Sequence, residues 1–137
     1  AAAALKTELT LPGVSQTISL ARTAERSSAM PSGEELETLA RSGATLAIHL
    51  SIRNIARIVE ALKPAYGADC PVAIAARVSW PDEAILRGTL ADIEAKATES
   101  GIARTAVILV GRVLDPPGFS DSRLYAPDHA RALKPKR

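Results

Sequence analysis

The fold of this chain is decided by one stretch, Pro71-Val72-Ala73-Ile74-Ala75-Ala76-Arg77-Val78-Ser79-Trp80-Pro81-Asp82-Glu83. Its first part, 71–78, is almost wholly apolar and predicts a buried strand that stops at a Trp-Pro-Asp-Glu turn. Apolar runs at 44–50 and 105–113 predict two further strands, the second of them central in the sheet. Ligands of such α/β layers bind where strands end, so the turn is the first place to look for function.

The remaining segments complete an α/β fold with a mixed five-stranded sheet flanked by helices. Residues 14–20 alternate apolar and polar side chains, which predicts a half-buried strand with Ile18 and Leu20 on the buried face. Residues 84–88 read as a short edge strand. Helices are expected at 32–42, 52–63 and 89–100, because apolar residues recur there at helical spacing.

Local signals set the expected helix ends. Ser32 and Glu35 have the spacing of a capping box, and Gly43 suits a left-handed C-cap. Ser51 is expected to cap the helix at 52–63, and Pro64 is expected to end it. Thr89 with Asp92 marks the start of the third helix.

The chain has 137 residues, which fits one domain. We expect a linker and helix end at 1–13, the α/β domain at 14–115 and a polar tail at 116–137. Basic and acidic residues number 17 and 15, so no strong positive field favours a nucleic-acid partner. The single cysteine, Cys70, suits a reducing cytoplasm, and no apolar run is long enough for a membrane span.

The residues alone suggest no self-contained catalytic site. His49 lies within an apolar strand and is expected to be a structural histidine, and Cys70 is expected to pack. Asp82 and Glu83 are adjacent in a turn, which favours a structural role over paired acid–base chemistry. Trp80 is either a stacking surface for a planar ligand or simply a large core hydrophobe. No spacing of His and Cys predicts a metal site.

Several blocks in this order resemble the C-terminal half of the tetrapyrrole methylases. The most specific are Leu11-Pro12-Gly13-Val14-Ser15-Gln16 and Ser79-Trp80-Pro81-Asp82-Glu83, supported by 44–51, 87–93 and 109–114. The family's N-terminal motifs, such as Gly-Pro-Gly-Asp-Pro, do not occur here. The start at Ala1 without Met is therefore expected of a chain that begins within a longer protein.

The resemblance implies two α/β domains with S-adenosylmethionine in the cleft between them, this chain supplying the second domain. The positions that match the family's cofactor contacts are Ala21, Arg22, Leu50, Val78 and Thr89. The family commonly has Thr-Arg at 21–22 and Tyr-Arg/Lys-Ala at 76–78, so contacts there are expected through the backbone. Trp80 and Arg77 are expected to face a flat, polycarboxylated substrate; on residues alone, Leu50 and Val78 fit a core role equally well.

Within the family, the likeness is to members that methylate C-11 of precorrin-4 in cobalamin biosynthesis. It implies a corrin precursor as substrate, either precorrin-4 or its cobalt form, and a homodimer. A sulfonium already activates its methyl group, so a cleft that aligns the reactants is sufficient and no catalytic triad is needed. The alternative is a truncated, non-catalytic fragment that acts as a folded dimerisation or binding module.

Overall fold

The computed structural model describes residues 1–23, 30–116 and 118. Its helices are α1 (Ala2–Leu5), α2 (Leu36–Ala40), α3 (Ile55–Tyr66) and α4 (Ile93–Ser100), with 3-10 turns η1 (Ile52–Asn54) and η2 (Arg112–Leu114). Its strands are β1 (Ile18–Arg22), β2 (Thr45–His49), β3 (Pro71–Ala76), β4 (Ala84–Thr89) and β5 (Ala106–Val110). Most of the predicted polar tail, including the basic run at 131–137, lies outside the described residues.

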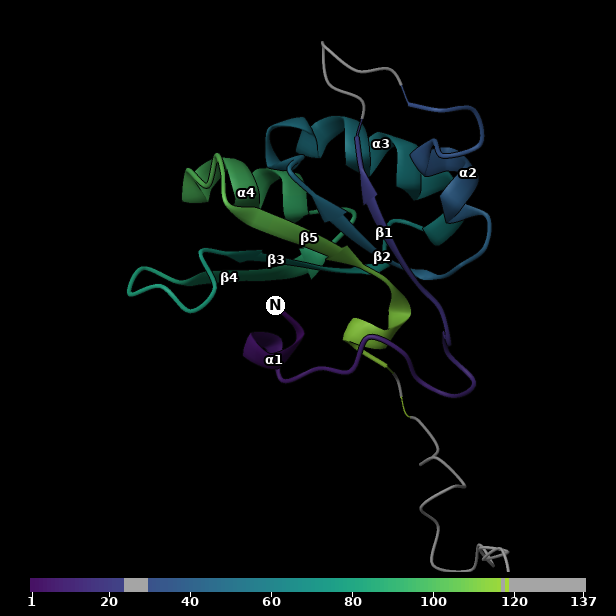
Figure 1. Ribbon diagram of the computed structural model, residues 1–137, viewed down its shortest axis with the longest axis horizontal. Helices are drawn as coiled ribbons and strands as arrows, with labels where there is room; N and C mark the ends of the chain where they lie inside the picture. Colours follow the sequence, from purple (N-terminus) through teal and green to yellow (C-terminus); the bar gives the residue numbers. More distant parts are fainter. Residues whose placement is uncertain (24–29, 117, 119–137) are drawn as a thin grey trace, which may run out of the picture.

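The five strands form one mixed sheet in the order β1-β2-β5-β3-β4. Only β1 and β2 run parallel; the other three neighbouring pairs are antiparallel. The predicted mixed five-stranded sheet is confirmed, as are the central position of β5 and the edge position of β4. Figure 1 shows the sheet between an upper layer of α2, α3 and α4 and a thinner lower layer containing α1.

Alternating side chains of the inner strands feed two separate cores. Leu46, Ile48, Ile74 and Ile108 face the helix layer, where Ile58, Leu62 and Ile93 cover them. The intervening residues Ala47, Ala73 and Leu109 face the opposite side and meet Leu5, Leu11, Val113 and Leu114. This two-sided burial explains why these strands read as continuous apolar runs rather than as alternating ones.

The predicted buried face of the first strand is wrong. Leu20 is 73% exposed and Ile18 is 37% exposed, whereas Ser19 and Ala21 are half-buried. Leu20 pairs with Ala47 and therefore lies on the side of the sheet that the thin lower layer covers. That layer spans the central strands and stops short of the edge strand β1, so the larger side chains of this strand remain in solvent. The strand also begins later than predicted, at Ile18.

Three predicted helix ends are also wrong. The capping box does not form, because Glu35 accepts hydrogen bonds from Gly33 N and Thr38 Oγ1, and α2 begins at Leu36 instead of residue 32. Pro64 lies inside α3, which continues to Tyr66. Proline has no N–H to donate to the carbonyl oxygen one turn earlier, but an exposed carbonyl can accept a hydrogen bond from water instead. Asp92, instead of Thr89, is the N-cap position of α4.

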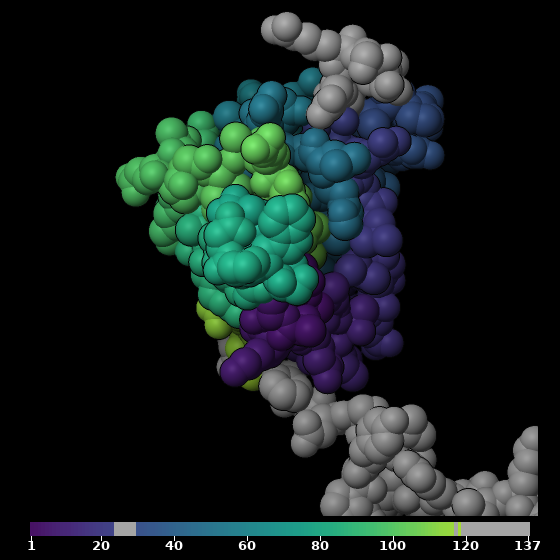
Figure 2. Space-filling model, turned by 60° about the vertical axis from the view of Figure 1, so that its left-hand side comes forward, coloured from purple at the N-terminus to yellow at the C-terminus, as the bar shows by residue number. Residues whose placement is uncertain are grey.

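The N-terminal segment packs against the β3–β4 hairpin. Arg87 of β4 donates a hydrogen bond to the Leu5 carbonyl oxygen at 2.7 Å, and Ile85 packs into the same core as Leu5. Figure 2 shows this contact as the teal hairpin lying directly on the purple N-terminal residues. The start of the chain is thereby held beside the end of the sheet where β2 and β3 finish and β5 begins.

Candidate functional site

One end of the sheet carries an unusual concentration of left-handed backbone. Leu50, Arg77, Ser79 and Thr105 have φ values of 56°, 46°, 70° and 54°, and all four follow or precede strands at this end. Non-glycine residues adopt this conformation at a cost of about 1 kcal/mol or more each. The hydrogen bond from Arg77 N to Thr105 O, 2.8 Å long, holds two of these turns together. Such clustered strain marks a site where backbone shape matters.

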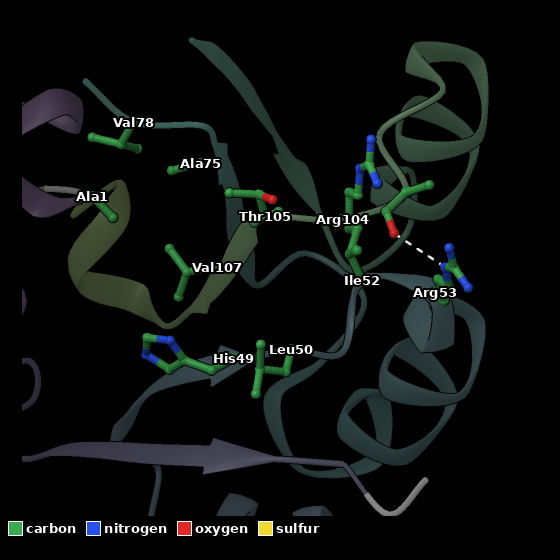
Figure 3. A pocket seen from close by; sticks show the side chains of 12 residues that line it. Ala1, His49, Leu50, Ile52, Arg53, Ala75, Val78, Arg104, Thr105 and Val107 are labelled. Carbon is green, nitrogen blue, oxygen red and sulfur yellow. Dashed lines mark hydrogen bonds between the residues drawn. The ribbon is translucent and has the colours of Figure 1, made fainter. Parts of the chain in front are cut away.

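These turns surround an open cavity of about 480 Å3. Its floor is made by the ends of three neighbouring strands, because His49, Val107 and Ala75 are paired across β2, β5 and β3. Figure 3 shows Leu50 and His49 on one side and Val78 on the other, with Val107 and Thr105 between them. The lining residues are Ala1, His49, Leu50, Ile52, Arg53, Ala75, Val78, Ala103, Arg104, Thr105, Ala106 and Val107. The walls are mainly apolar, with basic side chains among them.

The structure brings two of the five predicted cofactor residues into this cavity. Leu50 is 72% exposed and Val78 is half-buried, so neither is the core residue that a continuous apolar strand suggests. Ala21 and Arg22 end β1 at the same end of the sheet, where Arg22 is paired with His49. Thr89 lies at the far end of the sheet, paired with Pro71, and does not line the cavity.

The predicted substrate residues Arg77 and Trp80 lie in the turn between β3 and β4. Arg77 Nε lies 2.5 Å from a carboxylate oxygen of Asp82 and donates to the Asp82 backbone oxygen. Glu83 accepts a hydrogen bond from Ser79 N at 2.8 Å. Asp82 and Glu83 therefore build the turn, as predicted. Trp80 is 59% exposed, which excludes the core reading and leaves a surface aromatic two positions after the cavity residue Val78.

His49 is one of the cavity residues that the sequence reasoning missed, as are Arg53 and Arg104. The expectation of an interior structural histidine is wrong, because His49 is exposed at the last position of β2 and lines the cavity. Leu50 turns into the left-handed region directly after it, and the strand leaves the two packed layers at this point. The available signal was its place immediately before Leu50, at the strand end that was already expected to bind ligand.

A polar network fixes the exit of β2 that carries Leu50. The buried Ser51 hydroxyl donates to His49 O at 2.7 Å and accepts a hydrogen bond from Thr23 N at 2.9 Å. Asn54 in turn donates to Thr23 Oγ1. Ser51 was predicted to cap the following helix, and no cap hydrogen bond from its side chain forms. It instead ties the ends of the parallel strands β1 and β2 together.

Cys70 and Tyr66 are structural, at the opposite end of the sheet. Cys70 is fully buried, and burial raises the pKa of its thiol to about 11, so it is not a reactive thiolate. Burial likewise raises the pKa of Tyr66 to about 12, and its hydroxyl donates to the Ala44 carbonyl oxygen. Packing was the predicted role of Cys70.

Two classes of site are not found among the residues that the structure describes. No group of three or more His, Cys, Asp or Glu side chains there is placed to hold a metal ion. No described helix combines the length and the apolar character that crossing a bilayer requires.

The fold is that of a methylase domain. The sequence profile of the tetrapyrrole (corrin/porphyrin) methylases matches residues 1–94, and the chain belongs to this family. It is 55% identical over 134 residues to precorrin-4 C(11)-methyltransferase of Pseudomonas aeruginosa, covering 98% of this chain and 53% of that protein. It is 45% identical to cobalt-precorrin-4 C(11)-methyltransferase of Methanocaldococcus jannaschii, covering 91% and 48%.

Solved structures give the same picture. A cobalt precorrin-4 methyltransferase matches with a TM-score of 0.80 and 36% identity, covering 84% of this chain and 48% of that one. Uroporphyrin-III C-methyl transferase of Thermus thermophilus, solved with S-adenosyl homocysteine, shares the fold at a TM-score of 0.64 and 19% identity. It covers 80% of this chain and 48% of that one. The chain spans about half the length of the curated relatives that it matches.

Proposed function

We propose that this chain forms one wall of an S-adenosylmethionine-dependent methyltransferase that methylates C-11 of precorrin-4 or of its cobalt form. The observation that carries the proposal is the cavity bordered by Leu50 and Val78, where the strands β2 and β3 end. Leu50 and Val78 are two of the five positions that resemblance matched to cofactor contacts. They are far apart in the chain and line one cavity. Relatives that are 45–55% identical carry this activity in their names.

The lining suits the cofactor. The volume of about 480 Å3 is in the usual range for small-molecule sites, and the side chains of Leu50, Val78 and Val107 offer apolar contact for an adenine ring. S-adenosylmethionine, when bound, supplies a methyl group that is already activated for transfer. The work left to Leu50 and Val78 is to orient the ligand and exclude water.

We assign the remaining predicted residues to the borders of this site. Ala21 and Arg22 end β1 beside the cavity. Trp80 and Arg77 lie in the turn that also carries the cavity residue Val78, and the exposed ring of Trp80 can stack on a flat macrocycle. Thr89 does not border this site. It lies at the far end of the sheet, so it could contact a cofactor only at a second site. We place the activity in the cytoplasm, in keeping with a single, buried cysteine.

The test is methyl transfer by this chain joined to the N-terminal half of the Pseudomonas aeruginosa relative. The joined protein is expected to methylate precorrin-4, and Leu50→Arg is expected to abolish transfer by placing a charge in the adenine wall. Ala95→Arg is the control for added charge, because Ala95 is exposed on α4 and does not line the cavity. Full activity of the Leu50→Arg protein would refute the site, and loss of activity in both variants would show a general effect of the added charge.

A second candidate function is a self-associating module. It is favoured by the uncovered apolar face of the edge strand β1, formed by Ile18 and Leu20. An edge strand with exposed apolar side chains is a ready surface for pairing with another copy. We propose a homodimer, which is compatible with the methyltransferase proposal.

A further inference from the structure

The cavity is lined by basic side chains and by no described carboxylate. Its titratable lining residues are His49, Arg53 and Arg104. A concave site of one sign focuses its field on the ligand, so this cavity favours negatively charged groups. An adenine wall alone does not require this charge, since adenine is neutral. The basic side chains therefore favour a ligand that also carries an anionic group.

Arg53 is tied to the segment between α4 and β5 that carries Arg104, and both residues line the cavity. Arg53 Nε donates a hydrogen bond to Ala103 O at 3.2 Å, which places this guanidinium beside the residue preceding Arg104 (Figure 3). Arg53 lies in η1, directly before α3, and its bond to Ala103 O holds it on the same side of the cavity as Arg104. Among the residues that the structure describes, no other hydrogen bond occupies its guanidinium, and a planar guanidinium suits bidentate binding of a carboxylate.

The charges of these two arginines are not neutralised within the described part of the chain. The ion pairs there join Arg77 to Asp82, Lys96 to Asp92 and Arg112 to Asp69. Arg77, which the sequence favoured as a substrate residue, already has an acidic partner. Arg53 and Arg104 are exposed and border the same cavity, so their charge is directed to a ligand.

We propose that Arg53 and Arg104 form a carboxylate-binding site that holds an acidic side chain of the tetrapyrrole substrate. The identity of the ligand rests on the proposed function. The observation that both arginines line the cavity does not depend on that function. The same chemistry could be supplied by the amino-acid carboxylate of the cofactor. The macrocycle is favoured because it carries several carboxylates, and two separate arginines with His49 nearby match a multiply charged ligand better than a single group.

The test uses binding and needs no methyl transfer. Uroporphyrin III, a stable polycarboxylic tetrapyrrole, is titrated into the 137-residue chain and into the joined protein, with quenching of Trp80 fluorescence as readout. Arg53→Gln and Arg104→Gln are each expected to weaken binding about tenfold, the size of effect expected for one charged hydrogen bond. Arg57→Gln is the matched control, since Arg57 is exposed on α3 and does not line the cavity.

Arg104→Gln guards against a folding artefact, because the Arg53 variant also loses the bond to Ala103. Binding of S-adenosylhomocysteine to the joined protein and its variants is measured in parallel. Weaker uroporphyrin binding with unchanged S-adenosylhomocysteine binding supports the proposal. Unchanged uroporphyrin binding in both variants overturns it, and so does a loss confined to S-adenosylhomocysteine, which would assign the arginines to the cofactor. A failure of methyl transfer alone bears on the proposed function only.

Discussion

Replacing Leu50 with Asn tests whether this residue serves the ligand or the fold. Leu50 has a φ of 56° and is 72% exposed. Asn adopts the left-handed region readily, so Leu50→Asn relieves about 1 kcal/mol of backbone strain. Full burial of a leucine contributes roughly 1.5–3 kcal/mol, and less than a third of that is at stake here, about 0.4–0.8 kcal/mol. The two terms nearly cancel, and the free energy of unfolding is expected to change by no more than about 0.5 kcal/mol.

Urea denaturation of the 137-residue chain measures this change, with two controls. Leu20→Asn replaces a leucine that is 73% exposed in an extended strand, where no strain is relieved, and is expected to cost about 1 kcal/mol more than Leu50→Asn. Leu46→Ala removes a fully buried side chain and is expected to cost about 2–5 kcal/mol. A cost for Leu50→Asn that equals or exceeds that of Leu20→Asn would refute the reasoning, since it would mean that the left-handed turn is not strained.

Three further predictions concern association, pH and the buried thiol. Leu20→Lys is expected to shift sedimentation of the chain toward monomer, because Leu20 dominates the uncovered face of β1; a parent chain that is strictly monomeric at high concentration would contradict this. The hydrogen bond from Lys96 is the main cause that lowers the pKa of Asp92, and the hydrogen bond from Thr89 N adds to it. The Asp92 carboxylate therefore stabilises the folded state at pH values above its pKa in the unfolded chain, and this contribution is lost as pH falls through its pKa in the folded chain. Asp92→Asn should therefore be less stable than the parent at pH 7, with a difference that shrinks below about pH 4 in thermal unfolding; a constant difference would argue against the ionic contribution. Cys70, buried and with a pKa of about 11, should react with a thiol reagent at pH 8 only after denaturant is added; rapid reaction of the native chain would contradict its burial.

The central strands were predictable because burial on both faces gives them an almost wholly apolar composition. Residues of β2, β3 and β5 pack against both layers, so apolar runs marked them clearly, and Pro71–Ala76 set the middle of the fold. The face of β1 was not predictable in this way. Its alternation of Ile18 and Leu20 with polar residues is real, but which face is covered depends on how far the lower layer extends.

The candidate site was predictable in part for a related reason. Leu50 and Val78 follow apolar strands, and strand ends are where α/β sheets bind ligands, so both fall at the cavity. Thr89 was assigned from resemblance alone, and only the pairing with Pro71 reveals that it lies at the other end. Arg53 and Arg104 are far apart in sequence and reach one cavity because η1 packs beside β5 and the segment before it, which no local pattern encodes.

The most direct measurement of the central claim is calorimetric binding of S-adenosylhomocysteine to two proteins, the 137-residue chain and the same chain joined to the N-terminal half of its Pseudomonas aeruginosa relative. A cavity with Leu50 72% exposed leaves much of a ligand in water, so the ordering cost of binding is poorly offset in the chain alone. The account predicts micromolar binding by the joined protein and weak or undetectable binding by the chain alone. Micromolar binding by the chain alone would contradict the claim that it supplies one wall, and no binding by either protein would contradict the assignment of the cavity to the cofactor.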